Sequence, residues 1–243
     1  ARAHALWTLD GMGVWDESLV LDAISDTNVE VRLAALRVAG EHILYHEASD
    51  VLIEAVSQPL PDDELEVATQ RLLSLSFHEK QTKAFAVRPG HTERVMKAAG
   101  EFIDKPILAK AFMVALNPFE YLPALRTLSR NPRFHRKDHP LPQHLGFACL
   151  AQADEETLTA LLSFAAEAPV ELRDAVLEGF RLGSKAGKYV SLDLIRLKSK
   201  PSGLTAMEKS GVSEYALAIL HDQLTWPDDP KFKLQKALAP LKK

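Results

Sequence analysis

Apolar side chains recur in steps of three and four residues between Ser25 and Gly40, where the chain reads SDTNVEVRLAALRVAG. At this spacing Val29, Leu33 and Leu36 fall on one face of an α-helix. The polar run DTN precedes them and offers side-chain oxygens that can cap the first turn. The pattern therefore predicts a helix over residues 28–46.

The same periodicity predicts helices along most of the chain, with prolines and glycines mainly between them. The predicted helices lie within residues 16–24, 28–46, 50–57, 64–75, 93–103, 103–116, 118–129, 143–152, 155–166, 168–180, 190–198 and 212–224. Residues 77–90 read as irregular, and no stretch alternates long enough to predict a strand. We therefore expect an all-α protein.

Several predicted helix pairs share a charge signature, with an acidic residue in the turn between the helices and a basic residue at the start of the second helix. These positions are Arg2, Asp26, Arg32, Asp104, Lys110, Glu167 and Arg173. Similar intervals are typical of helix-pair repeats. We expect the charged side chains to form a structural ladder in which each base reaches its own turn and the next.

The stretch at residues 25–40 resembles the second helix of a HEAT repeat. The resemblance implies a right-handed α-α superhelix, a HEAT-like solenoid of about five to six irregular helix pairs over residues 1–224, followed by a linker over 225–243. Residues 1–12 align with the same helix, with Arg2 at the position of Arg32. We therefore expect the chain to begin inside a repeat, as an excised fragment.

The opening ARAHALWTLDGMG and the following VLDAISDTNVEVRLAALRVAGE resemble a narrower group. In these large bacterial multidomain proteins a membrane-bound, sugar-dehydrogenase-like β-propeller precedes HEAT repeats and a c-type cytochrome domain. The resemblance implies a spacer or docking scaffold between these modules, and a periplasmic or cell-envelope location. The chain has no CxxCH motif, so no haem ligand or catalytic residue is carried over.

Composition favours a packed core, because 47% of the 243 residues are hydrophobic and 26% are charged. The net charge of -4 disfavours binding to duplex nucleic acid, which usually needs a basic surface. The single cysteine, Cys149, excludes a disulfide within the chain. No apolar run approaches the roughly 18–20 residues of a membrane span.

Basic residues crowd the region around the break NPRFHRKDHPLP. They are Arg126, Arg130, Arg133, Arg136 and Lys137. They could bind an anion, an acidic partner or a lipid headgroup, or face acidic groups of the same protein. His135, His139 and His144 lie close by but match no familiar metal-ligand spacing, so we interpret them as loop residues. No motif predicts a catalytic, cofactor-binding or metal-binding residue.

The leading hypothesis is therefore a non-catalytic scaffold that positions neighbouring domains or binds a protein partner. A second hypothesis is a helical-repeat DNA glycosylase, which requires a basic concave face with a carboxylate and exposed tryptophans at its centre. A third is a lyase-type chaperone that holds a tetrapyrrole, as some HEAT-like proteins do.

Overall fold

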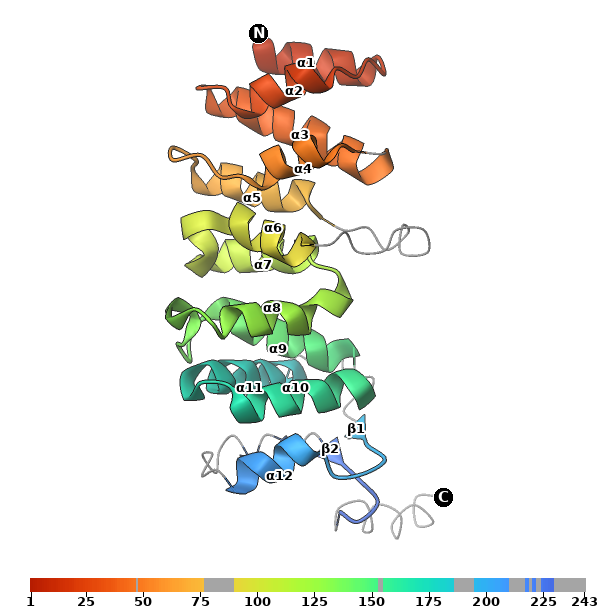
Figure 1. The fold of residues 1–243 in the computed structure, drawn as a ribbon, viewed down its shortest axis with the longest axis vertical. Helices are drawn as coiled ribbons and strands as arrows, with labels where there is room; N and C mark the ends of the chain where they lie inside the picture. Colours follow the sequence, from red (N-terminus) through yellow and green to blue (C-terminus); the bar gives the residue numbers. More distant parts are fainter. Residues whose placement is uncertain are drawn as a thin grey trace. The chain divides into compact units, whose positions relative to one another are not determined.

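The computed structural model describes residues 1–46, 48–76, 90–152, 155–185, 195–209, 217–218, 220–221 and 224–229. In these residues the secondary structure is helical apart from one pair of two-residue strands, so the predicted all-α class is confirmed (Figure 1). The chain divides into two compact units, residues 1–120 and 121–243.

Unit 1 is built from helices that pack on their second neighbours along the chain. They are α1 (Arg2–Gly11), α2 (Glu17–Ile24), α3 (Val29–Tyr45), α4 (Asp50–Ser57), α5 (Leu65–Ser74), α6 (His91–Ala99) and α7 (Pro106–Ala115), with 3₁₀ helices at Gly100–Asp104 and Pro118–Glu120. Helices α1, α3, α5 and α7 contact one another in succession, and so do α2, α4 and α6. The described part of unit 1 thus contains two rows of helices.

Local hydrogen bonds explain where the first helices begin. Asn28 is the N-cap of α3, and its side-chain oxygen accepts the backbone N–H groups of Glu30 and Val31 at 3.0 and 3.3 Å. Asp16 caps α2 in the same way by accepting the N–H of Leu19 at 3.2 Å. These bonds satisfy amide groups that have no partner within the helix. The cap predicted from the DTN run is confirmed.

Helices α3 and α5 approach closely because a glycine faces a serine. A Cβ atom added to Gly40 would lie 2.9 Å from the Cα atom of Ser74, so no larger residue fits there without movement. The Ser74 hydroxyl donates to the carbonyl oxygen of Leu36 at 2.6 Å. Leu36 and Ala39 are fully buried beside this contact and form part of the unit 1 core.

Unit 2 repeats this mode of packing with even closer helix contacts. Its elements are α8 (Tyr121–Leu128), a 3₁₀ helix (Pro132–Phe134), α9 (Pro140–Gln152), α10 (Glu155–Glu167), α11 (Val170–Lys185), β1 (Ile195–Arg196), α12 (Ser202–Lys209) and β2 (Leu224–Thr225). Helix α9 packs on α11, and α10 packs on α8 and α12. A Cβ atom at Gly146 would lie 2.3 Å from the Val176 carbonyl oxygen, and one at Gly179 would lie 2.1 Å from that of Gln143. Helices α9 and α11 therefore touch backbone to backbone.

The C-terminal part of unit 2 differs from the sequence prediction. Of the helix predicted over 190–198, residues 190–194 lie outside the described residues, and the prediction is wrong at 195–198. There Ile195 and Arg196 pair in parallel with Leu224 and Thr225 as β1 and β2. Helix α12 begins inside the KSKPSG segment, where the sequence predicts a break. Of the helix predicted over 212–224, residues 217–218 and 220–221 are helical, whereas Leu224 is in β2, so the prediction is wrong there; the other residues lie outside the described part of the chain. Of the predicted linker, 225–229 are described, and 230–243 lie outside the described residues.

The structure also bears on the predicted irregular segment, 77–90, and on the tryptophan of the predicted linker. The segment expected to be irregular, 77–90, falls almost wholly outside the described residues, which resume at Gly90. Trp226, in the predicted linker, is buried. Its indole lies under the ammonium group of Lys200, with the nitrogen 5.7 Å from the ring centroid. The segment around β2 is thereby packed onto the segment that leads into α12.

Candidate functional site

A buried arginine joins two successive interhelical turns of unit 1. Arg32 in α3 is only 1% exposed. One of its terminal nitrogens, Nη1, donates to the carbonyl oxygen of Asp26 at 2.9 Å and to Asp62 Oδ2 at 3.1 Å. The other, Nη2, donates to the Asp62 carbonyl oxygen at 3.2 Å, and Nε lies 3.4 Å from Asp63 Oδ1. Arg32 thus contacts the turn before its own helix and the turn before α5.

A second buried arginine shares the same carboxylate. The side chain of Arg71 in α5 is fully buried, and its Nε donates to Asp63 Oδ2 at 2.8 Å. Its Nη1 donates to the carbonyl oxygens of Ala55 and Val56, both at 3.0 Å, at the end of α4. Sequence reasoning missed this residue because it compared Ala68 with Arg32. The sequence feature that could have identified Arg71 is the presence of a basic residue one helical turn after Ala68.

The other predicted ladder residues of unit 1 differ in whether they form ion pairs with each other. Arg2 Nη1 lies 2.7 Å from Asp26 Oδ2, so the structure brings this pair together. Asp104 is the last residue of the 3₁₀ helix Gly100–Asp104. Lys110 is exposed on α7 and has no ion pair among the described residues. The structure does not bring Asp104 and Lys110 into an ion pair of the kind that Arg2 and Asp26 form.

The predicted ladder residues of unit 2 are separated. Arg173 is buried in α11, and its Nε lies 3.7 Å from Asp174 Oδ1 in the same helix. Glu167 is exposed at the end of α10 and has no ion pair within the described part of the chain. Glu167 can therefore contact other groups at the surface.

A histidine–glutamate pair forms another buried ionic contact of unit 1. His91 Nδ1 lies 2.9 Å from Glu120 Oε2, and His91 Nε2 lies 3.1 Å from the carbonyl oxygen of Leu75. Glu120 also accepts the Thr92 hydroxyl and the Asn117 N–H, each at 2.9 Å. Both ring nitrogens face acceptors, which is the environment of a charged imidazolium. Sequence reasoning missed the pair, whose members are 29 positions apart.

The pKa values of His91 and Glu120 are shifted in opposite directions from their ordinary values. Burial disfavours the charged ring of His91, but hydrogen bonding and attraction to the Glu120 carboxylate outweigh it, and the pKa of His91 is raised. Burial also disfavours the Glu120 carboxylate, but its contacts with His91 and the Asn117 N–H outweigh this, and the pKa of Glu120 is lowered. Each partner thus favours the charged form of the other. The pair fixes the start of α6 to the end of unit 1.

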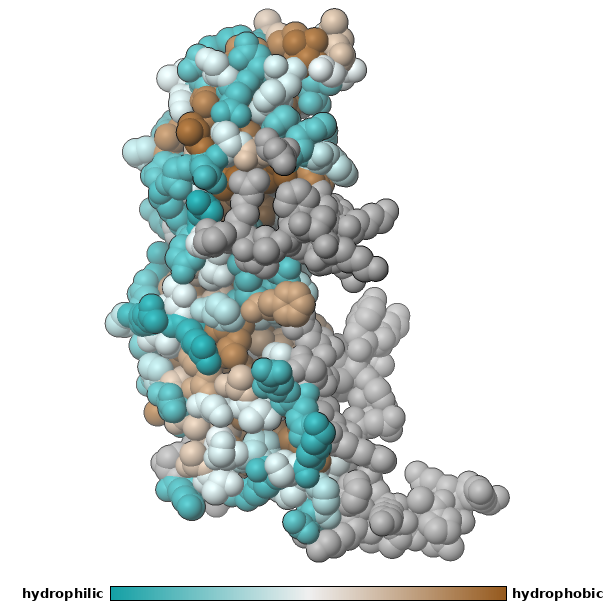
Figure 2. Space-filling model, turned by 45° about the vertical axis from the view of Figure 1, so that its right-hand side comes forward, coloured by the Kyte–Doolittle hydropathy of each residue, from teal (hydrophilic) through white to brown (hydrophobic). Residues whose placement is uncertain are grey.

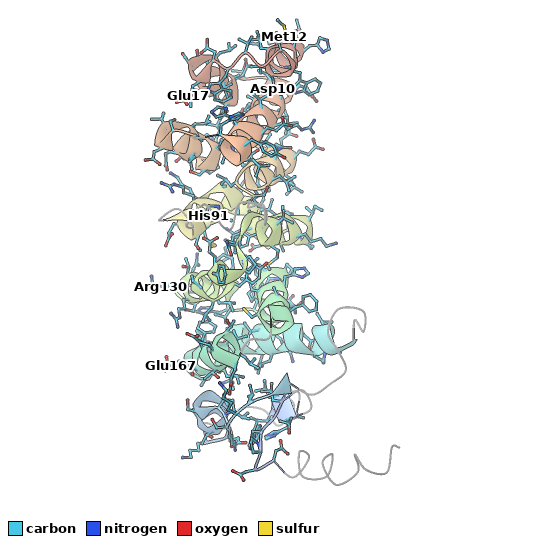
Figure 3. All side chains as sticks on the ribbon, turned by 90° about the vertical axis from the view of Figure 1, so that its right-hand side faces the viewer. Asp10, Met12, Glu17, His91, Arg130 and Glu167 are labelled. Carbon is cyan, nitrogen blue, oxygen red and sulfur yellow. The ribbon has the colours of Figure 1, made fainter. Side chains whose placement is uncertain are left out.

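The hollow between α8 and α10 is the best candidate for a binding site. Its volume is about 560 Å³. It is lined by Arg126, Ser129 and Arg130 on one side and by Ala160, Ser163, Phe164, Glu167, Ala168 and Pro169 on the other. Figure 3 shows the labelled side chains of Arg130 and Glu167 on the same side of unit 2. We call this the α8–α10 hollow.

The charges of the α8–α10 hollow have no partners within the described part of the protein. Arg126 and Arg130 are exposed, and neither side chain forms a hydrogen bond or an ion pair with another described residue. Ser129 donates its hydroxyl to the Arg126 carbonyl oxygen at 2.8 Å, and Ser163 donates to that of Thr159 at 3.0 Å. Because both hydroxyl groups already donate to nearby backbone carbonyl oxygens, the two guanidinium groups and the Glu167 carboxylate are the main groups of the hollow that can bind a ligand.

The five residues of the predicted basic cluster lie at several separate sites in unit 2. Arg126 and Arg130 line the α8–α10 hollow, whereas Lys137 lines a separate hollow of about 450 Å³. Arg136 Nε lies 3.4 Å from Asp138 Oδ1. Arg133 is exposed on the 3₁₀ helix Pro132–Phe134. The structure therefore brings Arg126 and Arg130 together and separates them from Lys137.

The remaining reactive residues of unit 2 have structural contacts. His135 Nε2 lies 3.0 Å from the Ser129 carbonyl oxygen, and the buried His139 accepts the N–H of Leu141 at 3.2 Å through Nδ1. His139 lies in the segment before α9, as the loop interpretation predicts, but its side chain is buried and not solvated. The loop interpretation is wrong for His144, which lies within α9. Cys149 is buried, and burial raises the pKa of its thiol to about 12.

Some apolar side chains are exposed near the N-terminus of unit 1. Figure 2 shows brown side chains among teal ones in this part of the chain. Large exposed residues in the first three helices and the segments between them include Trp7, Met12, Val14 and Tyr45. Trp15 is partly covered because its ring stacks on His42 with the centroids 3.6 Å apart. Among these residues there is no cluster of ionisable groups comparable to that of the α8–α10 hollow.

No group of three or more potential metal ligands is found among the residues that the structure describes. In the same residues, every helix is too short or too polar to cross a membrane. The chain matches no family model, no curated protein and no solved structure. The function therefore has to be inferred from the geometry.

Proposed function

We propose that this chain is a non-catalytic helical-repeat scaffold that positions neighbouring domains or binds a protein partner. In this proposal the helix pairs continue as a HEAT-like, right-handed α-α superhelix of about five to six irregular pairs. The successive contacts of α1, α3, α5 and α7 in unit 1 support it. In such repeats each unit buries its apolar face against the next, which leaves the outer surfaces free for partners.

The observation that carries the proposal is that charged side chains buried in unit 1 form ion pairs with one another. Arg32 and Arg71 share Asp63, and His91 is paired with Glu120. Each of these contacts joins separate helices or turns of unit 1. Active sites instead direct perturbed ionisable groups into a cavity that holds the substrate. These buried charges therefore support a role in assembly of the repeats.

Small-angle X-ray scattering of the purified chain tests the architecture. A compact globule of 243 residues has a radius of gyration of about 18 Å. Stacked helix pairs are expected to give a clearly larger radius and an elongated distance distribution. A radius near the globular value would contradict the proposed superhelix.

Cross-linking in an extract of the source organism tests the role. We expect a protein to be recovered that also binds the purified chain directly, in a calorimetric titration at micromolar affinity or better. The chain should produce no turnover of its own in the complex. A defined substrate converted by the purified chain, with activity lost in a point variant, would refute the proposal.

A further inference from the structure

We propose that the α8–α10 hollow binds a short segment of a partner polypeptide that carries both signs of charge. A carboxylate of this segment faces Arg126 and Arg130, and a cationic side chain faces Glu167. This inference rests on the proposed function as a scaffold and names the chemistry of its partner.

The basic side of the hollow is suited to a carboxylate. Arg126 lies in the last turn of α8 and Arg130 lies two residues after the end of this helix, and both side chains line the same hollow. Neither guanidinium group is neutralised by the described part of the protein. A guanidinium group presents parallel N–H donors that match the two oxygens of a carboxylate. The pair can therefore hold one or two acidic side chains.

Part of the lining of the hollow is apolar, which suits a peptide better than a bare anion. Phe164 and the alanines at positions 160 and 168 are among the lining residues. A volume of about 560 Å³ is within the range of ligand pockets in proteins. An apolar side chain between the charged groups of the segment could contact these residues. Burial of such a side chain contributes affinity that a small ion could not obtain.

The acidic group in the hollow selects against polyanions. Glu167 lies in the same hollow as Arg126 and Arg130 and has no ion pair among the described residues. A nucleic acid or an anionic lipid surface carries negative charge throughout, so part of it would face this carboxylate. The net charge of -4 opposes such ligands as well. A segment with an acidic and a basic end satisfies both sides.

Fluorescence anisotropy with labelled heptapeptides on the full chain tests the inference. The probes are EEVTVKK, its amide analogue QQVTVKK, the acidic EEVTVEE, the basic KKVTVKK, and a short oligothymidylate. The variants are Arg126→Glu with Arg130→Glu, and separately Glu167→Lys. Lys110→Glu is the control, because it reverses an exposed charge outside the hollow. Circular dichroism verifies that each variant is folded.

We expect the wild-type chain and the control to prefer EEVTVKK over every other probe. Exposed ion pairs contribute modestly, so reversing both arginines should weaken EEVTVKK about tenfold. The double variant should then prefer KKVTVKK, and Glu167→Lys should prefer EEVTVEE. These inverted preferences would show that the three side chains contact the ligand directly.

Three results would overturn the inference. One is equal binding of EEVTVKK to the wild type and to the double arginine variant. Another is oligothymidylate binding as tight as that of the peptide. The third is absence of peptide binding. If scattering still shows an elongated particle and a cross-linked partner is still recovered, the scaffold proposal survives while the assignment of the α8–α10 hollow fails.

Discussion

Replacing Asp63 with asparagine removes a carboxylate that faces two buried arginines. Its side chain is 3% exposed, and those of Arg32 and Arg71 are 1% and 0% exposed. Asparagine has almost the same shape and can still accept the N–H of Leu60, which Asp63 Oδ2 accepts at 2.9 Å. The substitution therefore changes charge more than packing.

The expected loss follows from this burial. Removing one partner of a buried ion pair leaves an uncompensated charge in the core and typically costs about 3–5 kcal/mol of stability. Arg32 keeps its contact with Asp62, but Arg71 retains only the carbonyl oxygens of α4 among its described contacts. We therefore expect Asp63→Asn to reduce the free energy of unfolding of unit 1 by about 3 kcal/mol or more.

The neighbouring aspartate provides a matched control. Asp62 also contacts Arg32, at 3.1 Å, but its side chain is 66% exposed. Exposed pairs contribute about 0–1 kcal/mol, so Asp62→Asn should be nearly neutral. Urea denaturation followed by far-UV circular dichroism measures both variants. Equal losses for the two, or a loss below about 1 kcal/mol for Asp63→Asn, would refute the view that burial makes this bridge important.

Three further predictions concern other sites. Because the pKa of His91 is raised, its contribution to stability is fully present below pH 6.5 and is lost as the pH rises through the raised value. The pKa of Glu120 is lowered, so its contribution is present above pH 4.5 and is lost as the pH falls through the lowered value. Urea denaturation at a series of pH values should therefore show a weaker pH dependence of stability in Glu120→Gln, and an unchanged profile would contradict the ion pair. Gly179→Ala should destabilise the protein by about 1–3 kcal/mol or more, since its methyl group would meet the backbone of α9, while Gly11→Ala, where nothing lies within 4 Å, should be neutral or slightly stabilising in the same thermal melts. The buried thiol of Cys149, with a pKa of about 12, should react with iodoacetamide at pH 8 only after urea unfolding, as mass spectrometry would detect; rapid labelling of the native protein would be inconsistent with its burial.

Local patterns predict most of the helices of unit 1 because they carry their own periodicity, and α2, α3 and α4 also have side-chain N-caps. The prediction for residues 50–57 coincides with α4, and that for 28–46 differs from α3 by one residue at each end. The prediction fails where distant segments decide the outcome. Ile195 forms a strand because it pairs with Leu224. Gly203 signals a break, yet it lies in α12 because only a residue without a side chain fits against Leu162.

The candidate site was only partly predictable for the same reason. The basic cluster is visible in the sequence, but the division of its members between two hollows depends on how α8 and α10 pack. Glu167 reads as a ladder residue, and only its exposed position at the end of α10 places it beside Arg126 and Arg130. The charge pattern indicates which residues can bind, whereas the three-dimensional packing determines which of them can bind together.

The buried bridges also determine where this chain can be divided for expression. A truncated version that stops at Ser57 would retain the whole of α3 but deprive Arg32 of both Asp62 and Asp63. The orphaned guanidinium would draw water into the helix junction, and such a piece should be prone to aggregation. A terminus placed after Glu120 keeps the bridges described for unit 1 intact, so shorter recombinant versions should end there or beyond.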